Sequence, residues 1–119
     1  MDEELVQLPW EYIEPRGKIL LARIDGESAG CVAVRPLSGT DCEMRRLYVR
    51  SAHRSAGVGH ELVEQVIVSA RDAGYDRIVL NTLPAMSHAL ALYRRFGFSE
   101  IDPYVKESSS GVIYMGLAL

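Results

Sequence analysis

The amino-acid sequence predicts an α+β domain, in which two helices pack on a mixed, mostly antiparallel sheet. Three observations support this fold class. Residues 18 to 50 contain segments of sheet-forming residues separated by turn signals. Two amphipathic helical patterns follow, at about 57 to 73 and 88 to 96. Further strand-like segments stand between and after these helices, so the predicted order is β-β-β-α-β-α-β-β.

The composition fits a single folded domain over residues 1 to 119, since 48% of the residues are hydrophobic and 24% are charged. A net charge of −3 argues against a nucleic-acid partner, because such proteins are usually basic. The N-terminus, MDEELVQL, has neither the basic nor the apolar region of a signal peptide, and no apolar run approaches the ~18 residues of a membrane span. We therefore expect a cytoplasmic protein that does not enter a membrane.

The first half of the chain predicts a short helix and then three strands. Residues 3 to 8 are interpreted as a short helix that Pro9 ends. The strand KILLARID, 18 to 25, leads through the hairpin signal DGE into SAGCVAVRPL, 28 to 37, which should be its antiparallel neighbour. CEMRRLYVR, 42 to 50, is a third strand, rich in residues that suit sheets.

Two helices are predicted from the spacing of apolar residues. The first, 57 to 73, ends at Gly74, a residue type that favours the position after a helix. Its apolar face consists of Leu62, Val63, Val66, Ile67, Ala70 and Ala73. The second, 88 to 96, is capped by Ser87 and ended by Gly97. Its apolar face consists of Ala89, Leu92, Tyr93 and Phe96.

The remaining strands complete the sheet. DRIVLNTL, 76 to 83, follows a strand and a helix, so a right-handed crossover should place it parallel to strand 42 to 50. FSEID, 98 to 102, is a short strand, and GVIYMGLAL, 111 to 119, is the last one.

The junction between strand 42 to 50 and the first helix contains Gly57 and Gly59, preceded by Arg54. A helix N-terminus presents unpaired backbone N–H groups and partial positive charge, and glycines let a ligand approach the backbone. The junction can therefore cradle a phosphate. The alternative is that the glycines relieve crowding in a turn, and for a bare Gly-x-Gly pattern we favour that alternative.

Two motifs favour the phosphate cradle over the relief of crowding. Arg54-x-x-Gly57-x-Gly59, between RRLYV and an amphipathic helix, resembles motif A of the GNAT superfamily of N-acetyltransferases. ALALYRRFGF, residues 89 to 98, is similar to motif B, a helix with a tyrosine followed by Gly-Phe. The resemblance covers about residues 17 to 119 and implies the α/β-type GNAT fold, with the sheet splayed between strands 42 to 50 and 76 to 83.

The resemblance implies that acetyl-coenzyme A is the co-substrate, with no metal. Its pyrophosphate would lie on backbone N–H groups near the glycines, and its pantetheine arm would enter the splay and pair with backbone groups that the sheet leaves free. The residues assigned to the coenzyme in this way are Leu47, Tyr48, Val49, Arg54, Ser55, Ala56, Gly57, Val58, Gly59, His60, Asn81 and Ala89.

The reaction implied by the family is direct acetyl transfer to a primary amine. A backbone N–H, assigned to Val49, would stabilise the oxyanion. Tyr93 matches the motif B tyrosine and would protonate the departing thiolate, although it can equally be a half-buried core residue.

Glu43 stands where many relatives carry a general base, which would act through water on the amine. The alternative is an exposed strand glutamate without a catalytic role. Relatives carry a bulge in this strand, so simple alternation does not assign its faces.

The sequence departs from the family at its N-terminus. GNAT domains begin with a strand and two helices, whereas here about 16 residues precede the first hairpin, and residues 1 to 16 are assigned to a partial helix and a loop. We therefore expect an exposed apolar edge or face that a second copy covers, as a homodimer. The same departure supports an alternative function, a non-catalytic acyl-CoA-binding module or sensor.

Neither cysteine is marked as a nucleophile. Cys31, in the apolar run AGCVAV, is predicted to be a small buried residue, and neither Cys31 nor Cys42, which has acids but no histidine beside it, is interpreted as a catalytic nucleophile. The three histidines do not form a metal-binding spacing.

Overall fold

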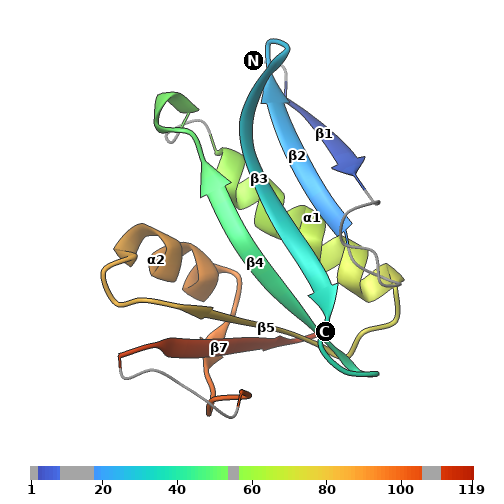
Figure 1. Cartoon of the computed structure of the whole chain (residues 1–119), viewed down its shortest axis with the longest axis vertical. Helices are drawn as coiled ribbons and strands as arrows, with labels where there is room; N and C mark the ends of the chain where they lie inside the picture. Colours follow the sequence, from blue (N-terminus) through green and yellow to red (C-terminus); the bar gives the residue numbers. More distant parts are fainter. Residues whose placement is uncertain (1–2, 9–17, 54–56, 106–110) are drawn as a thin grey trace.

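The computed structural model describes residues 3–8, 18–53, 57–105 and 111–119. The elements in these ranges are β1 (Glu3–Leu8), β2 (Lys18–Ile24), β3 (Glu27–Pro36), β4 (Asp41–Val49), the 3-10 turn η1 (Ser51–His53), α1 (Val58–Asp72), β5 (Arg77–Thr82), α2 (Ser87–Arg95), β6 (Ser99–Glu100) and β7 (Ile113–Ala118). The described strands form one sheet in the order β1-β2-β3-β4-β5-β7-β6, and only β4 and β5 are parallel (Figure 1). The predicted α+β fold with a mixed, mostly antiparallel sheet is confirmed.

The hairpin between β2 and β3 turns at the predicted place. Asp25 and Gly26 have φ angles of 52° and 81°. A two-residue turn with both central φ angles positive twists in the same sense as the strands it joins, and Asp-Gly is a favoured pair for it. The turn pairs Ile24 with Glu27 and Arg23 with Ser28, and a register shift follows before Ala22 pairs with Gly30.

The prediction of a helix at residues 3 to 8 is wrong. These residues form β1, which pairs antiparallel with β2 from Glu3↔Ile24 to Leu8↔Ile19. An isolated helix of six residues is unstable in water, whereas the free edge of β2 supplies a partner for the backbone groups of the segment. The N-terminal strand of the family is therefore present, and residues 9–17, predicted to be a loop, lie outside the described residues.

The helices pack as their apolar patterns indicate, with two corrections. Ser87 was expected to cap α2, but it is the first helical residue, and Met86 occupies the cap position without a side-chain hydrogen bond. All four predicted face residues pack on the core cluster, and Leu90, which was not predicted, is buried as well. Both helices share one apolar cluster with the sheet, and α1 lies behind β2, β3 and β4 in Figure 1.

A bulge in β4 shapes the sheet beside the start of α1. Tyr48 lies opposite Cys31, but Arg45 lies opposite Ala33, so β4 contains one more residue than β3 across this stretch. The bulge expected in this strand is confirmed. Cys31 itself is only half-buried, contrary to the prediction, although burial still raises the pKa of its thiol.

Gly30 allows the backbone of β4 and the side chains of α1 to approach β3. A Cβ atom at this position would lie 2.6 Å from the backbone oxygen of Tyr48 and 3.2 Å from Cγ1 of Val58. The first of these contacts involves backbone, which cannot turn aside as a flexible side chain does. Glycine is therefore required here by packing.

We predict that Gly30→Ala lowers the free energy of unfolding by about 1–3 kcal/mol, because overpacking forces the backbone to shift. Urea-induced unfolding measures this change. Gly39→Ala is the matched control, since a Cβ at Gly39 meets nothing within 4 Å. Equal stabilities of the two variants would contradict the proposed role of Gly30.

Candidate active site

The parallel strands β4 and β5 pair only at their first residues. Their register runs from Asp41↔Arg77 to Glu43↔Val79 and then stops, although β4 continues to Val49. On their outer sides, β3 stays paired with β4 as far as Val49, and β7 stays paired with β5 along its length. The strands therefore diverge with their inner edges facing each other, as Figure 1 shows, and the predicted splay is confirmed.

The N-terminus of α1 presents backbone donors near the end of β4. The first helical hydrogen bond runs from the N–H of Glu61 to the oxygen of Gly57, over 3.1 Å. The N–H groups of Val58, Gly59 and His60 precede it and have no intrahelical acceptor, and no side chain among the described residues caps this end. The helix dipole adds partial positive charge there, so the site favours an anion.

The fold explains why Gly57 and Gly59 are glycines. Gly57 has φ 79°, a left-handed conformation that glycine adopts without strain, and a Cβ there would meet nothing within 4 Å. A Cβ at Gly59 would lie 3.3 Å from Cδ2 of Leu92 and 3.6 Å from Cγ2 of Val49. Gly59 thus brings the end of β4, the start of α1 and α2 together at one place.

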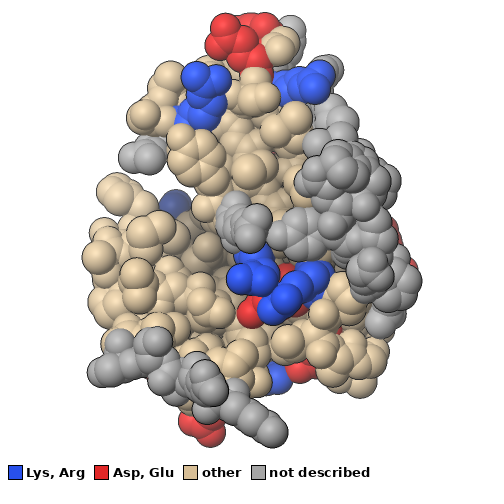
Figure 2. Space-filling view, in the orientation of Figure 1, with Lys and Arg blue, Asp and Glu red and all other residues tan. Residues whose placement is uncertain are grey.

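The coenzyme residues assigned from sequence differ in exposure. Leu47, Val49 and Ala89 are half-buried against the core, whereas the side chain of Tyr48 is 55% exposed. Apart from Gly57, Gly59 and Asn81, the remaining coenzyme residues fall into three groups. Val58 is fully buried; His60 is exposed, with its ring centroid 4.6 Å from that of Phe96; and Arg54, Ser55 and Ala56 lie outside the described residues. The surface is notched between the end of β4 and α2 (Figure 2).

Tyr93 lies on the inward face of α2, next to Leu92. It is 6% exposed, its ring centroid lies 5.8 Å from that of Phe98, and burial raises its pKa to about 12. The phenol therefore stays neutral at pH 7 and keeps a proton that it can donate. Tyr93 also belongs to the apolar core cluster, so the alternative that it is only a core residue explains its position equally well.

Glu43 is not the exposed strand glutamate of the alternative interpretation. Its side chain is 3% exposed, and it lies at the last paired position between β4 and β5. Nε of Arg35 donates to its Oε1 over 2.8 Å, and Nε of Arg45 lies 3.6 Å from the same oxygen. The hydroxyl of Tyr104 donates to its Oε2 over 2.6 Å. Each oxygen of the buried carboxylate therefore accepts a hydrogen bond.

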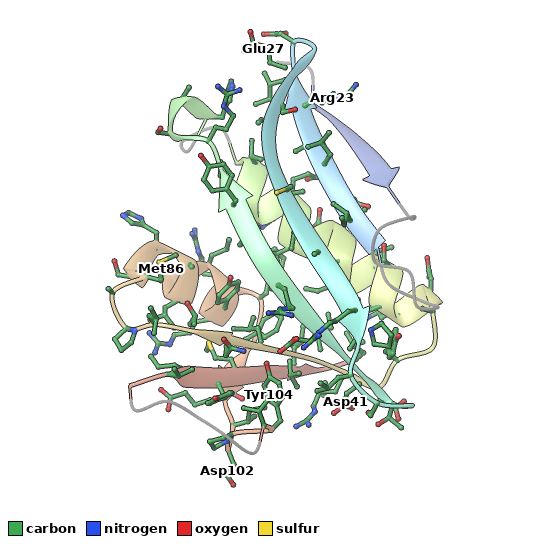
Figure 3. The ribbon with its side chains drawn as sticks, viewed as in Figure 1. Arg23, Glu27, Asp41, Met86, Asp102 and Tyr104 are labelled. Carbon is green, nitrogen blue, oxygen red and sulfur yellow. The ribbon has the colours of Figure 1, made fainter. Side chains whose placement is uncertain are left out.

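Tyr104 connects the two halves of the split sheet. Its hydroxyl accepts a hydrogen bond of 3.1 Å from Nδ2 of Asn81 on β5 while it donates to Glu43 on β4. Its ring stands edge-on to Tyr114 of β7, with 5.2 Å between centroids. Burial and the hydrogen bond to Glu43 raise the pKa of Tyr104. Figure 3 shows Tyr104 beside β7, on the face of the sheet opposite α1.

Two members of this cluster were missed from the sequence. Arg35 lies directly opposite Glu43 in the antiparallel register of β3 and β4, so the hairpin register contained a usable signal. Tyr104 follows β6 in a segment without regular structure, and no periodic pattern points to it. Asn81, assigned to the coenzyme from sequence, donates a hydrogen bond to the hydroxyl of Tyr104.

A separate depression of about 710 Å³ lies beside Tyr104. Its lining residues are Arg77, Glu100, Ile101, Asp102, Pro103 and Tyr104. Arg77 begins β5, at the end where β4 and β5 are still paired, so this depression is not the opening between the strands.

The diverging parallel strands, the β4 bulge and the uncapped helix agree with the motifs that resemble GNAT proteins. The model of the acetyltransferase (GNAT) family matches residues 1–98. The chain belongs to this family. The prediction of an N-acetyltransferase is thereby confirmed at the level of the family.

Relatives named as N-acetyltransferases support the assignment. An uncharacterised N-acetyltransferase of Schizosaccharomyces pombe is 40% identical over 121 residues, which cover 100% of this chain and 74% of the relative. One from Dictyostelium discoideum is 42% identical over 66% of this chain and 37% of its own length. One from Escherichia coli is 31% identical over 85% of this chain and 62% of its own length. The chain thus spans less than two thirds of the last two relatives.

Solved structures share the fold. A GNAT acetyltransferase of Elizabethkingia anophelis with acetyl-CoA bound has a TM-score of 0.80 at 19% identity, over 98% of both chains. The IAA acetyltransferase of Bacillus cereus has a TM-score of 0.83 at 17% identity, over 99% of this chain and 100% of the other. Nourseothricin acetyltransferase has a TM-score of 0.76 at 28% identity, over 88% of this chain and 66% of its own.

Two features of the described residues concern membranes and metal ions. Their helices include none that is long and apolar enough to cross a membrane. Their His, Cys, Asp and Glu side chains include no group of three placed to hold a metal ion. The expected cytoplasmic location and homodimer stay predictions.

We predict that Tyr104→Phe lowers the free energy of unfolding by about 1–3 kcal/mol, because it removes one donor from a buried carboxylate. Chemical denaturation measures the loss. Tyr48→Phe is the matched control. The side chain of Tyr48 is exposed and its hydroxyl makes no hydrogen bond to the described residues, so its substitution should have little effect. A Tyr104→Phe protein as stable as the control would show that the cluster does not hold the sheet together.

Proposed function

We propose that this chain transfers the acetyl group of acetyl-coenzyme A directly to a primary amine. The observation that carries the proposal is the divergence of β4 and β5 beside the uncapped N-terminus of α1. A ligand that fills this place needs two parts: an anion for the helix N-terminus, and amides for the inner strand edges. Coenzyme A contains both, as a pyrophosphate and a pantetheine arm.

The coenzyme would extend from the N-terminus of α1 along the end of β4, with α2 beside it. The N–H groups of Val58, Gly59 and His60, with residues 54–56 before them, would receive the pyrophosphate. The backbone of Leu47, Tyr48 and Val49 would pair with the pantetheine amides, and Ala89 would line the arm from α2. The Elizabethkingia anophelis protein with acetyl-CoA bound and a Bacillus subtilis acetyltransferase in complex with CoA, which is 24% identical, share this fold and support the choice of ligand.

Three groups would carry the reaction. The N–H of Val49 would donate to the oxyanion that forms as the amine attacks the thioester. Tyr93, a phenol that is neutral at pH 7, would donate its proton to the departing thiolate. Glu43, held in place by Arg35, would take the proton of the amine through a water molecule.

The rival proposal is a module that binds acyl-CoA without catalysis. The burial of Tyr93 in the core cluster is the observation that favours it, because a purely structural tyrosine would lie in the same way. The two proposals predict the same coenzyme binding and different effects of removing one hydroxyl.

We predict that Tyr93→Phe reduces turnover by about 10²-fold, the size expected when a general acid is lost. Release of coenzyme A thiol in the presence of acceptor amines measures turnover. Coenzyme A should still raise the melting temperature of the variant, because the proposed binding contacts are backbone groups.

Tyr75→Phe is the control, since Tyr75 is another buried core tyrosine but follows α1 rather than lying on α2. Its turnover per folded molecule should stay near that of the wild type. Unchanged turnover in Tyr93→Phe would reject Tyr93 as the acid, and an unchanged melting temperature of the wild type at millimolar coenzyme A would reject the proposed function.

A further inference from the structure

Two arginines share a single carboxylate on the sheet face opposite α1. Arg35 of β3 and Arg45 of β4 both direct Nε toward Oε1 of Glu43, at 2.8 and 3.6 Å. The carboxylate is 3% exposed, whereas the side chains of Arg35 and Arg45 are 43% and 39% exposed. The cluster therefore has a buried negative centre and a cationic surface.

The charges of this cluster do not balance within the described residues. Arg35 and Arg45 supply two positive charges, and Glu43 supplies one negative charge. The next ionised pair along the strands, Arg77 and Asp41, is internally neutral, with Nη2 and Oδ2 2.8 Å apart. Figure 2 shows Lys and Arg side chains gathered in the middle of this face, with a smaller acidic surface beside them.

The two guanidinium groups keep donors available. Arg35 uses Nε in its hydrogen bond to Glu43, and Arg45 lies beyond hydrogen-bond distance of the same oxygen. Their Nη groups make no hydrogen bond to the residues that the structure describes. Arginine presents such donors as a planar fork that matches a carboxylate, so this pair is suited to bind one.

A purely structural purpose accounts for one of these arginines. Arg35 already neutralises the buried carboxylate at short range, and Tyr104 satisfies its other oxygen. Arg45 adds little to that pairing at 3.6 Å. Its guanidinium lies beside the group to which we assign the deprotonation of the amine, where part of an acceptor would rest.

We propose that the acceptor carries a carboxylate close to its amine, as an amino acid does, and that Arg45, with Arg35, binds this carboxylate. The inference rests on the proposed function, because it assigns the acceptor to the face that contains Glu43. It makes Arg45 a specificity-determining residue that contacts substrate and holds the amine near the base.

The test compares the proteinogenic L-amino acids with their carboxamides as acceptors, with thiol release from acetyl-coenzyme A as the readout. Each pair presents the same side chain with and without the negative charge. We expect the best amino acid to have a kcat/KM at least about tenfold above that of its carboxamide, the effect of a charge-assisted hydrogen bond. The amine of a carboxamide is less basic and so more often unprotonated, which biases the comparison against this result.

Arg45→Gln should lower the ratio of kcat/KM for that amino acid to kcat/KM for its carboxamide by about tenfold, because the charged contact is made only with the carboxylate. Arg45→Lys should recover part of the preference. Arg23→Gln is the matched control, because Arg23 lies at the turn end of β2, well away from Tyr104 in Figure 3. This variant should prefer the amino acid over its carboxamide as strongly as the wild type does.

The inference is overturned if carboxamides are used as well as amino acids, if Arg45→Gln keeps the full preference, or if no amino acid releases thiol. Its failure is distinguishable from failure of the proposed function. Turnover of a simple amine such as tyramine, together with stabilisation by coenzyme A, would retain the acetyltransferase and reject only the carboxylate. If no amine is acetylated and coenzyme A does not stabilise the protein, the proposed function itself is rejected.

Discussion

The site depends on one constraint: two parallel strands in the middle of the sheet stop pairing after Glu43 and Val79. Backbone N–H and C=O groups that lose a partner away from water lower stability unless another group replaces it. On the face opposite α1, the Glu43–Tyr104–Asn81 contacts connect the strands where their backbone pairing ends. Beyond that point the inner edges stay apart, and this is the space to which we assign the pantetheine arm.

The other features of the site place α1 against this opening. The bulge in β4 and the missing side chain at Gly30 let α1 approach the sheet, and Gly59 lets it approach α2. The left-handed conformation of Gly57 turns the chain into the helix with its first N–H groups uncapped. Each glycine thus has a structural cause, and the anion site follows from the way the elements meet. This differs from the simpler idea that the glycines exist only to avoid a collision with a phosphate.

Much of this arrangement could be read from the sequence. The hairpin at Asp25-Gly26 and the apolar face of α1 have periodic or local signals, so their elements were predicted within one or two residues. The strand at residues 3–8 was not predicted, because a short segment takes its structure from its partner, here the edge of β2. The environment of Glu43 escaped prediction for a similar reason: Tyr104 reaches it from 61 positions away, and no local pattern encodes that contact.

Amide hydrogen exchange with and without coenzyme A tests the central claim most directly, because it reports the opening of individual backbone groups. The account predicts that coenzyme A slows exchange at Leu47, Tyr48 or Val49 and at Val58, Gly59 and His60, while amides paired between β1 and β2 exchange at an unchanged rate. Protection confined to residues 100–104, beside the separate depression, would contradict it. So would coenzyme binding that leaves the end of β4 and the start of α1 unprotected.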